Sequence, residues 1–299
     1  MTDAPDAALL RDFDRLLARA RNAGRWGADD EVGTPNLITR DHVIEAGRLI
    51  VSGETFSLAR PIHPEPGSDD TRLEVFAHDR GSSERLTISC HGYDITHIDA
   101  LCHHWSEPGA YNDRVPSELF DEAGHAQHLD VSVWHRGLVT RAVLLDVPGF
   151  RGVGHVAAGL PVHDAELREI CRAQNVDIRP GDAVAVYSGR DDYDLTHDVP
   201  WPGGSERTKP GLNPSIIRFL RDVDASVLVW DMMDDGPYDT RHTVHQAITS
   251  LGLAMVDNAS LGDLARACRA DGRYEFHLTV APLFVPGATG SAVNPIAAR

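Results

Sequence analysis

A segment of sixteen residues, Cys90–Trp105, holds four of the sixteen histidines in the chain and two of its aspartates. Imidazole and carboxylate groups are the ligands that proteins offer to Zn, Mn or Fe, and they also serve as general acids and bases. His97 and Asp99 lie two residues apart, so on a β-strand they point to the same face and can share one ion. His103 follows just beyond the strand end, where it can reach a bound water molecule. The segment therefore predicts a metal site with an acid–base group beside it.

The strand that would carry this site is predicted to run from residue 86 to residue 99. On such a strand, alternation places His91, Tyr93, His97 and Asp99 on one face. The alternative interpretation is a set of buried, hydrogen-bonded polar residues with surface histidines nearby. A single His-x-Asp pair would favour that alternative, but the density of histidine and aspartate in this segment favours a metal site.

Polar residues also follow several predicted apolar strands, at Asp146, at Ser188 and Arg190, at Asp231 and at Asp257. Ligands of α/β proteins gather at the carboxyl ends of strands, so these positions are candidates for a binding site. Each of them alone is more typical of a turn or of a helix cap.

Two later segments add acidic and imidazole groups. The acidic loop 231–239 lacks the alternating oxygen ligands and terminal glutamate of an EF-hand, so we interpret it as a solvated or supporting loop. His242 and His245 stand at the start of a predicted helix. Given a metal site elsewhere in the chain, one of them is a plausible remote ligand.

The elements that must position these groups follow from hydrophobic periodicity and from cap and turn residues. Helices are predicted at 7–21, from Thr39 or Asp41 to 49, and at 164–173, 213–221, 243–250 and 260–269. Strands are predicted at 55–58, 73–76, 86–99, 142–145, 183–187, 227–230, 253–256 and 276–280. Early strands followed by α/β alternation predict a mixed α/β fold. The segment 200–214, rich in proline and glycine, is interpreted as a surface or lid loop.

The composition limits the classes of partner. The 299 residues carry a formal net charge of −17, which offers no basic excess for nucleic acid or for an anionic membrane. No stretch of about 18 apolar residues occurs, and the N-terminus lacks the apolar core of a secretory signal. The four cysteines form no CxxC pair, which favours reduced thiols. We therefore expect a cytoplasmic protein that handles a small-molecule substrate.

The segment Thr96–His103 resembles the signature His-x-Gly-Thr-His-x-Asp-x-Pro-x-His of a metal-dependent cyclase/hydrolase family. This family includes bacterial kynurenine formamidase and isatin hydrolase. Four other segments look like parts of the same family, so the resemblance covers nearly the whole chain. They are 25–30, 179–182, 281–283 and 290–295.

The resemblance implies a swivelling β/β/α fold in a single domain, residues 1–299, with an N-terminal helical extension over about residues 1–50. It implies a hydrolase that opens or cleaves an amide, lactam, formamide or lactone bond of a small aromatic or cyclic substrate. One or two Zn or Mn ions would be held by His97, Asp99, His245 and Asp257, with His103 as the catalytic acid–base. The assembly implied is a homodimer or homotetramer.

Several positions depart from the family signature. Tyr93 stands where the family has its first histidine ligand, Ile95 replaces the glycine, Leu101 replaces the proline, and Asp257 replaces a glutamate. His91 could substitute for the missing ligand, although a continuous strand would put it about 6–7 Å further along. Two alternatives therefore stay open. One is a metal-dependent lyase or dehydratase, and the other is a small-molecule binding protein without catalysis on the same fold.

Overall fold

The computed structural model describes residues 7–64, 71–106, 109–199, 201, 209–235 and 242–299. The helices of this part are α1 (Ala7–Ala20), α2 (Arg40–Gly47), α3 (Val147–Arg151), α4 (Asp164–Gln174), α5 (Arg190–Thr196), α6 (Ile216–Asp222), α7 (Gln246–Leu251) and α8 (Gly262–Asp271). Short 3₁₀ helices occur at Thr34–Leu37, Tyr111–Asp113, Pro116–Glu118 and Val131–Trp134. The strands are β1 (Thr55–Ser57), β2 (Thr71–His78), β3 (Gly81–Ile88), β4 (His97–Asp99), β5 (Leu138–Asp146), β6 (Ala183–Tyr187), β7 (Val227–Trp230), β8 (Ala254–Asp257), β9 (Glu275–Val280), β10 (Gly290–Ala292) and β11 (Ile296–Ala298).

Nine of these strands form one mixed sheet in the order β1-β11-β9-β5-β6-β7-β8-β4-β10. Its centre, β5 to β8, is parallel, and antiparallel strands extend it on both sides. All residues of β6, β7 and β8 are buried. This explains why these strands are continuous apolar runs, since parallel strands are covered on both faces. The sheet confirms the predicted mixed α/β class.

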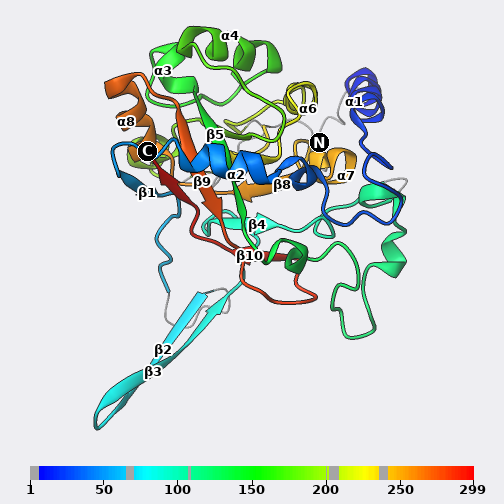
Figure 1. Cartoon of the computed structure of the whole chain (residues 1–299), viewed down its shortest axis with the longest axis vertical. Helices are drawn as coiled ribbons and strands as arrows, with labels where there is room; N and C mark the ends of the chain where they lie inside the picture. The colour runs from blue at the N-terminus through cyan, green and yellow to red at the C-terminus, as the bar shows by residue number, and fades with distance from the viewer. Residues whose placement is uncertain (1–6, 65–70, 107–108, 200, 202–208, 236–241) are drawn as a thin grey trace.

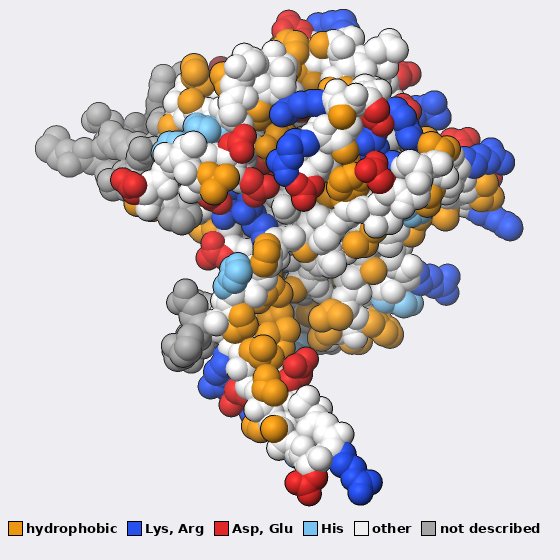
Figure 2. Space-filling view, turned by 90° about the vertical axis from the view of Figure 1, so that its left-hand side faces the viewer, with side chains coloured by type: hydrophobic (Ala, Val, Ile, Leu, Met, Phe, Trp, Pro, Cys, Tyr) orange, Lys and Arg blue, Asp and Glu red, His pale blue; other side chains and the backbone are white. Residues whose placement is uncertain are grey.

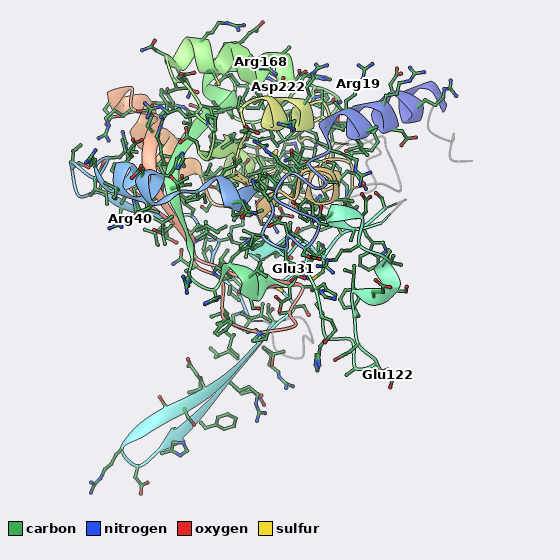
Figure 3. All side chains as sticks on the ribbon, turned by 45° about the vertical axis from the view of Figure 1, so that its right-hand side comes forward. Arg19, Glu31, Arg40, Glu122, Arg168 and Asp222 are labelled. Carbon is green, nitrogen blue, oxygen red and sulfur yellow. The ribbon has the colours of Figure 1, made fainter. Side chains whose placement is uncertain are left out.

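Helices cover this sheet and tie its connections together (Figure 1). The helix α2 packs on β5 and β9, whereas α4 packs on β5 and on α6. Figure 3 shows Arg168 of α4 beside Asp222 of α6, where the guanidinium Nη2 lies 2.6 Å from the carboxylate Oδ2. The N-terminal helix α1 packs on α6 and α7, with Phe13 buried. No helix among the described residues is long and apolar enough to span a membrane.

The strand β4 lies between β8 and β10 and pairs antiparallel with both. Its three residues are fully or almost fully buried. In this register His97 is directly opposite Asp257, and Asp99 is opposite Met255. Residues opposite each other on antiparallel strands share a face, so the register alone brings His97, Asp99 and Asp257 to one side of the sheet.

The strands β2 and β3 form a separate two-stranded sheet that projects from the body as an arm (Figure 1). Their register runs from Thr71 opposite Ile88 to His78 opposite Gly81. The tight connection, Asp79-Arg80, closes the hairpin at its tip. The sequence predicted a short strand at 73–76, and the structure extends it to eight residues.

The predicted continuous strand at 86–99 is wrong. The structure ends β3 at Ile88, bends through residues 89–96 and begins β4 at His97. Gly92 has a φ of +152°, which interrupts a regular strand. The Asn258 side-chain amide donates to the Gly92 and Ile95 carbonyls at 2.6 and 3.0 Å, so a side chain replaces a neighbouring strand as the partner of this backbone.

The other predicted elements are confirmed with shifts of a few residues at their ends. The capping prediction at Thr39 also holds, since its hydroxyl and backbone N–H both meet the His42 ring at the start of α2. The helices α3 and α5 and the strands β10 and β11 are not predicted by the sequence. Most of the predicted lid loop at 200–214 lies outside the described residues.

Candidate metal centre

The centre of the site is a buried pair of carboxylates on neighbouring strands. Asp99 on β4 and Asp257 on β8 are 0% and 1% exposed. His97, directly opposite Asp257 in the register, places its Nε2 at 3.4 Å from Asp99 Oδ1 and at 4.0 Å from Asp257 Oδ2. Two carboxylates excluded from water require compensating positive charge or a bound cation.

His245 reaches this pair from the N-terminal end of α7. Its Nε2 lies 3.0 Å from Asp257 Oδ2 and 3.8 Å from Asp99 Oδ2. Its Nδ1 lies 2.6 Å from Oδ2 of Asp234, in the loop after β7. The Asp234 carboxylate also accepts from the Val244 backbone N–H, which fixes it against the start of the helix.

The groups around the cluster orient each candidate ligand. His97 Nδ1 bonds to the Ile95 carbonyl at 2.8 Å, so its Nε2 is directed at the carboxylates. Trp230 at the end of β7 donates its indole N–H to Asp257 Oδ1 at 2.5 Å, which turns Oδ2 toward His245. Metal-binding histidines are typically held in this way, with the second ring nitrogen bonded to a carboxylate or carbonyl.

One oxygen in the cluster is left without a partner. Asp99 Oδ2 is buried and has no hydrogen-bond partner among the described residues. Asp99, His245 and Asp257 form a buried group of three residues whose candidate ligand atoms all lie within 4.8 Å of one another. Nitrogen and oxygen donors at this spacing suit a first-row divalent metal. The residues present therefore fit a metal ion.

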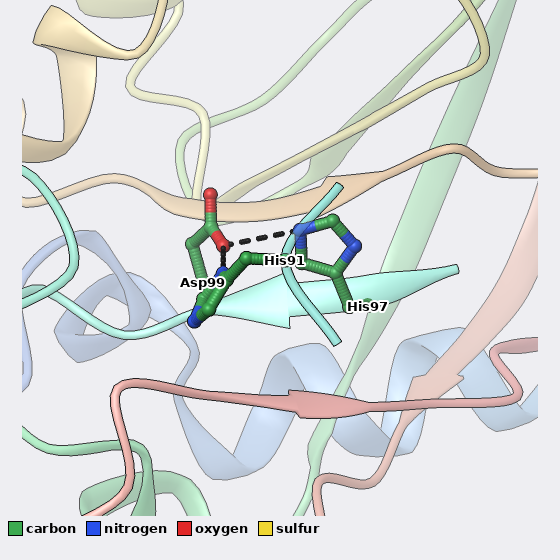
Figure 4. Close-up of side chains that lie close together, drawn as sticks. All are labelled: His91, His97 and Asp99. Carbon is green, nitrogen blue, oxygen red and sulfur yellow. Dashed lines mark hydrogen bonds and ion pairs between the residues drawn. The ribbon is translucent and has the colours of Figure 1, made fainter. Parts of the chain in front are cut away.

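A second group of three candidate ligands shares Asp99 and includes His91 (Figure 4). His91 Nδ1 lies 3.0 Å from Asp99 Oδ1, the same oxygen that faces His97. Its Nε2 lies 3.0 Å from the Thr289 hydroxyl. The expected separation of 6–7 Å along a continuous strand is thus wrong, because the bend at 89–96 folds His91 back onto Asp99.

Tyr93, which the resemblance aligns with the first histidine ligand, packs away from the cluster. Its ring packs edge-on against Trp201, with centroids 5.8 Å apart. It lines a cavity of about 580 Å³ whose wall also includes Arg60, His91 and Arg190. The cavity therefore borders the metal cluster through His91.

His103 lies at the edge of the cluster, beyond the end of β4. Its ring stacks on the His91 ring at 3.8 Å, and its Nε2 lies 4.0 Å from Asp99 Oδ1. The side chain is 29% exposed, whereas those of His97 and His245 are almost fully buried. The ring of His104 lies 6.3 Å from that of His245.

The electrostatics follow burial and these contacts. Burial by itself would lower the pKa of His97, but its hydrogen bond and attraction to Asp99 outweigh that effect and raise the pKa to about 9. The pKa of His245 is raised well above its ordinary value, because Asp234 and Asp257 overcome its desolvation. Burial lowers the pKa of His103, and it lowers that of His104 to about 4 with help from neighbouring histidines. The cluster thus favours the protonated form of His97 and His245, whereas burial favours the neutral form of His103 and His104.

Asp146, Arg190 and Asp231, the charged candidates at the other strand ends, have structural partners, whereas the buried Ser188 hydroxyl has no hydrogen-bond partner among the described residues. Asp146 accepts from the Gly149 N–H at the start of α3 and pairs with Arg269. Asp231 accepts from the backbone N–H groups of Ser188, Gly189, Arg190 and Met232. The structure brings only Asp257 of this set into the cluster. Of the acidic loop 231–239, residues 236–239 lie outside the described residues.

Two residues that support the cluster are not singled out by the sequence. The contact of Asp234 with His245 agrees with the interpretation of 231–239 as a solvated or supporting loop, whereas Trp230 is predicted only as the end of an apolar strand. Both act on cluster residues that are 11 and 27 positions away in the chain. Only the signal that several strands end in acidic residues at one edge of the sheet could have pointed to them.

Comparison with protein-family models assigns the chain to a family. The family model described as "Putative cyclase" matches residues 41–234. This chain belongs to that cyclase family. The match includes His97, Asp99 and His103 and ends before His245 and Asp257. A search of curated proteins gave no match.

Solved structures share the fold over most of the chain. A crystal structure of a novel cyclase is 25% identical with a TM-score of 0.84, and the alignment covers 95% of this chain and 99% of that one. Isatin hydrolase A from Labrenzia aggregata, bound to benzyl benzoate, is 17% identical with a TM-score of 0.53, covering 82% and 93%. A predicted metal-dependent hydrolase from Bacillus stearothermophilus is 13% identical with a TM-score of 0.52, covering 83% and 98%. The single-domain cyclase fold inferred from the sequence is thereby confirmed.

Proposed function

We propose that this protein is a metal-dependent hydrolase that opens or cleaves an amide, lactam, formamide or lactone bond of a small aromatic or cyclic substrate. The observation that carries the proposal is the buried group Asp99, His245 and Asp257, with an unpartnered carboxylate oxygen facing an oriented imidazole. Membership of the cyclase family and the fold shared with isatin hydrolase A support the choice of reaction.

The ligands we assign are His97, Asp99, His245 and Asp257. When bound, a divalent ion supplies Lewis-acid chemistry, acidifying water and polarising a carbonyl group. Zn and Mn both suit this mixture of imidazole and carboxylate donors. Because Asp99 also belongs to the group with His91 and His97, the donor set can serve one ion or two.

His103 is the residue we assign to proton transfer. It lies on the rim of the cluster with a partly exposed imidazole, and its ring is held parallel to that of His91. An imidazole at this place can take a proton from the attacking water and deliver it to the leaving nitrogen or oxygen. The adjoining cavity of about 580 Å³ is large enough for a small aromatic substrate.

Metal analysis of the purified protein tests the site. Purification from medium supplied with Zn²⁺ or Mn²⁺ should give stoichiometric metal, which His97→Ala should lose. His277→Ala is the matched control, because this partly buried histidine on β9 bonds to the Thr279 hydroxyl instead. A protein that neither holds nor responds to either ion would refute the proposal.

Substrate panels test the reaction. Formyl-anilides, lactams and lactones should be turned over by the metal-loaded protein, and the acyl product should carry oxygen from heavy-oxygen water. Turnover without incorporation of solvent oxygen would indicate a lyase or dehydratase. Ligand binding without turnover would indicate a binding protein.

A further inference from the structure

The candidate ligands His91, His97 and Asp99 gather around one carboxylate oxygen (Figure 4). Asp99 Oδ1 lies 3.0 Å from His91 Nδ1 and 3.4 Å from His97 Nε2. Donors that bind one ion at about 2.0–2.1 Å lie about 3.0 Å apart at right angles and about 3.4 Å apart in a tetrahedron. Both contacts of this oxygen therefore have the spacing of ligands around a single ion.

The His91 ring is held with its Nδ1 directed at that oxygen. Its Nε2 lies 3.0 Å from the Thr289 hydroxyl. The ring stacks on that of His103 with centroids 3.8 Å apart, and the backbone at Gly290 runs so close that a Cβ there would lie 2.6 Å from His91 Cε1. A histidine whose second nitrogen is bonded and whose ring is fixed in this way is typical of a metal ligand.

Asp99 faces two groups of candidate ligands with different oxygens. Oδ1 is the oxygen that His91 and His97 share. Oδ2, which has no hydrogen-bond partner among the described residues, lies 3.8 Å from His245 Nε2. The ions of a two-metal site are about 3.5–4 Å apart, a distance that one carboxylate can bridge. Asp99 is thus placed to connect two ions.

The two groups differ in negative charge. On the side of His245, Asp257 adds a second buried carboxylate to that of Asp99, and Asp234 lies behind the His245 ring at 2.6 Å. On the side of His91, the shared carboxylate of Asp99 is the one acidic ligand of the group. Because charges are poorly screened in a buried site, a cation is attracted more strongly to the side with more carboxylates.

The two groups also differ in access to solvent. The side chain of His91 is 29% exposed and lines the cavity of about 580 Å³, whereas that of His245 is 7% exposed. The cavity lies between segments 60–63 and 89–95, which flank β2 and β3 in the chain, and Figure 2 shows this junction of arm and body from the side. An ion beside His91 can therefore exchange through the cavity.

We propose that the cluster binds two divalent ions of unequal affinity, with His91 as a ligand of the weaker one. The inner ion is bound by Asp99 Oδ2, His245 and Asp257. The outer ion is bound by Asp99 Oδ1, His91 and His97, and it exchanges with solvent. The concentration of free divalent metal then sets the fraction of molecules that hold both ions. This inference rests on the metal site proposed above and adds a second, exchangeable ion to it.

Stepwise removal of Mn²⁺ from the full chain with a chelator tests the inference, with metal analysis and electron paramagnetic resonance as readouts. Wild type should release the outer ion at a chelator concentration about tenfold or more below that for the inner ion, with loss of the spectrum of a coupled pair. His91→Ala should hold the inner ion alone. His97 suits this test less well, because its Nε2 also approaches Asp257 Oδ2 at 4.0 Å and its removal disturbs both ions.

His63→Ala is the matched control. This exposed histidine lines the same cavity and belongs to none of the candidate metal groups among the described residues. The variant should release both ions as wild type does. A wild type that holds one ion at every metal concentration, or a His91→Ala variant that holds two, overturns the inference and leaves the proposed function standing. A protein that binds no divalent ion overturns both.

Thr289→Val and Thr289→Ser test the role of His91 without removing its ring. Valine keeps the shape of threonine but lacks the hydroxyl that contacts His91 Nε2, so it should weaken binding of the outer ion about 10–100-fold and leave the inner ion unchanged. Serine keeps the hydroxyl and should bind both ions as wild type does. Unchanged binding in the valine variant, or an equal loss for both ions, overturns the assignment of His91 to the outer ion.

Discussion

Trp230→Phe tests whether the cluster is a metal site that depends on oriented ligands. The substitution keeps an aromatic ring at the end of β7 but removes the indole N–H that bonds to Asp257 Oδ1 at 2.5 Å. Asp257 is 1% exposed, so water cannot easily take the place of that donor. Its carboxylate then loses the contact that turns Oδ2 toward His245.

The expected loss can be estimated from similar contacts. Removing a group that orients a metal ligand typically costs about 10–100-fold in metal affinity. This corresponds to about 1.4–2.8 kcal/mol of binding free energy. A buried acceptor left without its donor also lowers the free energy of unfolding by about 1–3 kcal/mol. The measurement must therefore separate an effect on metal binding from a general loss of stability.

Competition with a chelator of known affinity gives the metal dissociation constant of each variant, and thermal unfolding gives its stability. Trp134→Phe is the matched control. Trp134 is also buried, and it donates its indole N–H to the Val32 carbonyl at 3.1 Å. Both variants should be destabilised, but only Trp230→Phe should bind metal more weakly. Equal metal affinity in the two variants would refute the reasoning.

Three further predictions concern the acid–base group, an ion pair and a tight backbone contact. His103→Ala should lower kcat by about 10²–10⁴-fold with unchanged metal content; loss of metal would make His103 a ligand instead. Arg25 donates to both oxygens of Asp224 at 2.6 and 2.8 Å, which lowers the pKa of this carboxyl in the folded protein. The ion pair therefore stabilises the fold fully at pH values above the pKa of the unfolded carboxyl. This stabilisation is lost as the pH falls through the lower pKa of the folded state. Asp224→Asn should therefore cost about 1 kcal/mol of unfolding free energy at pH 7, and its difference from wild type should disappear in acid denaturation curves. In urea titrations, Gly33→Ala should lower the free energy of unfolding far more than Gly24→Ala. Both glycines have positive φ, but only a Cβ at Gly33 would overlap a neighbouring backbone carbonyl. Equal losses of unfolding free energy in the two variants would contradict this.

The central strands could be predicted from the sequence because their apolar residue pattern matches their buried environment in the fold. The runs Ala183–Tyr187 and Val227–Trp230 are apolar throughout and are buried throughout. His97 and Asp99 share a strand face by simple alternation, so their proximity needed no knowledge of the rest of the fold. The same alternation failed at His91, because the backbone there is held by Asn258, more than 160 residues away.

The supporting residues could not be predicted for a related reason. Asp234 and Trp230 meet the cluster only after β7, β8 and α7 have been placed side by side. Neither belongs to a recognisable motif, and an aspartate after a strand is usually a turn residue or a helix cap. The interactions that orient a ligand depend on how distant strands and helices are placed in the fold, and no single segment of the sequence determines that placement.

Asn258 combines three tasks in one residue. Its φ of +54° closes the turn after β8, in a conformation that asparagine tolerates better than most residues. Its amide nitrogen holds the bend before β4, and its amide oxygen accepts from Arg190 at 2.8 Å. Aspartate would lack the donor, and glycine would lack the whole group. The bend that carries His91 is therefore held by a single side chain, so one substitution at a residue that is not itself a candidate ligand is enough to release one side of the site.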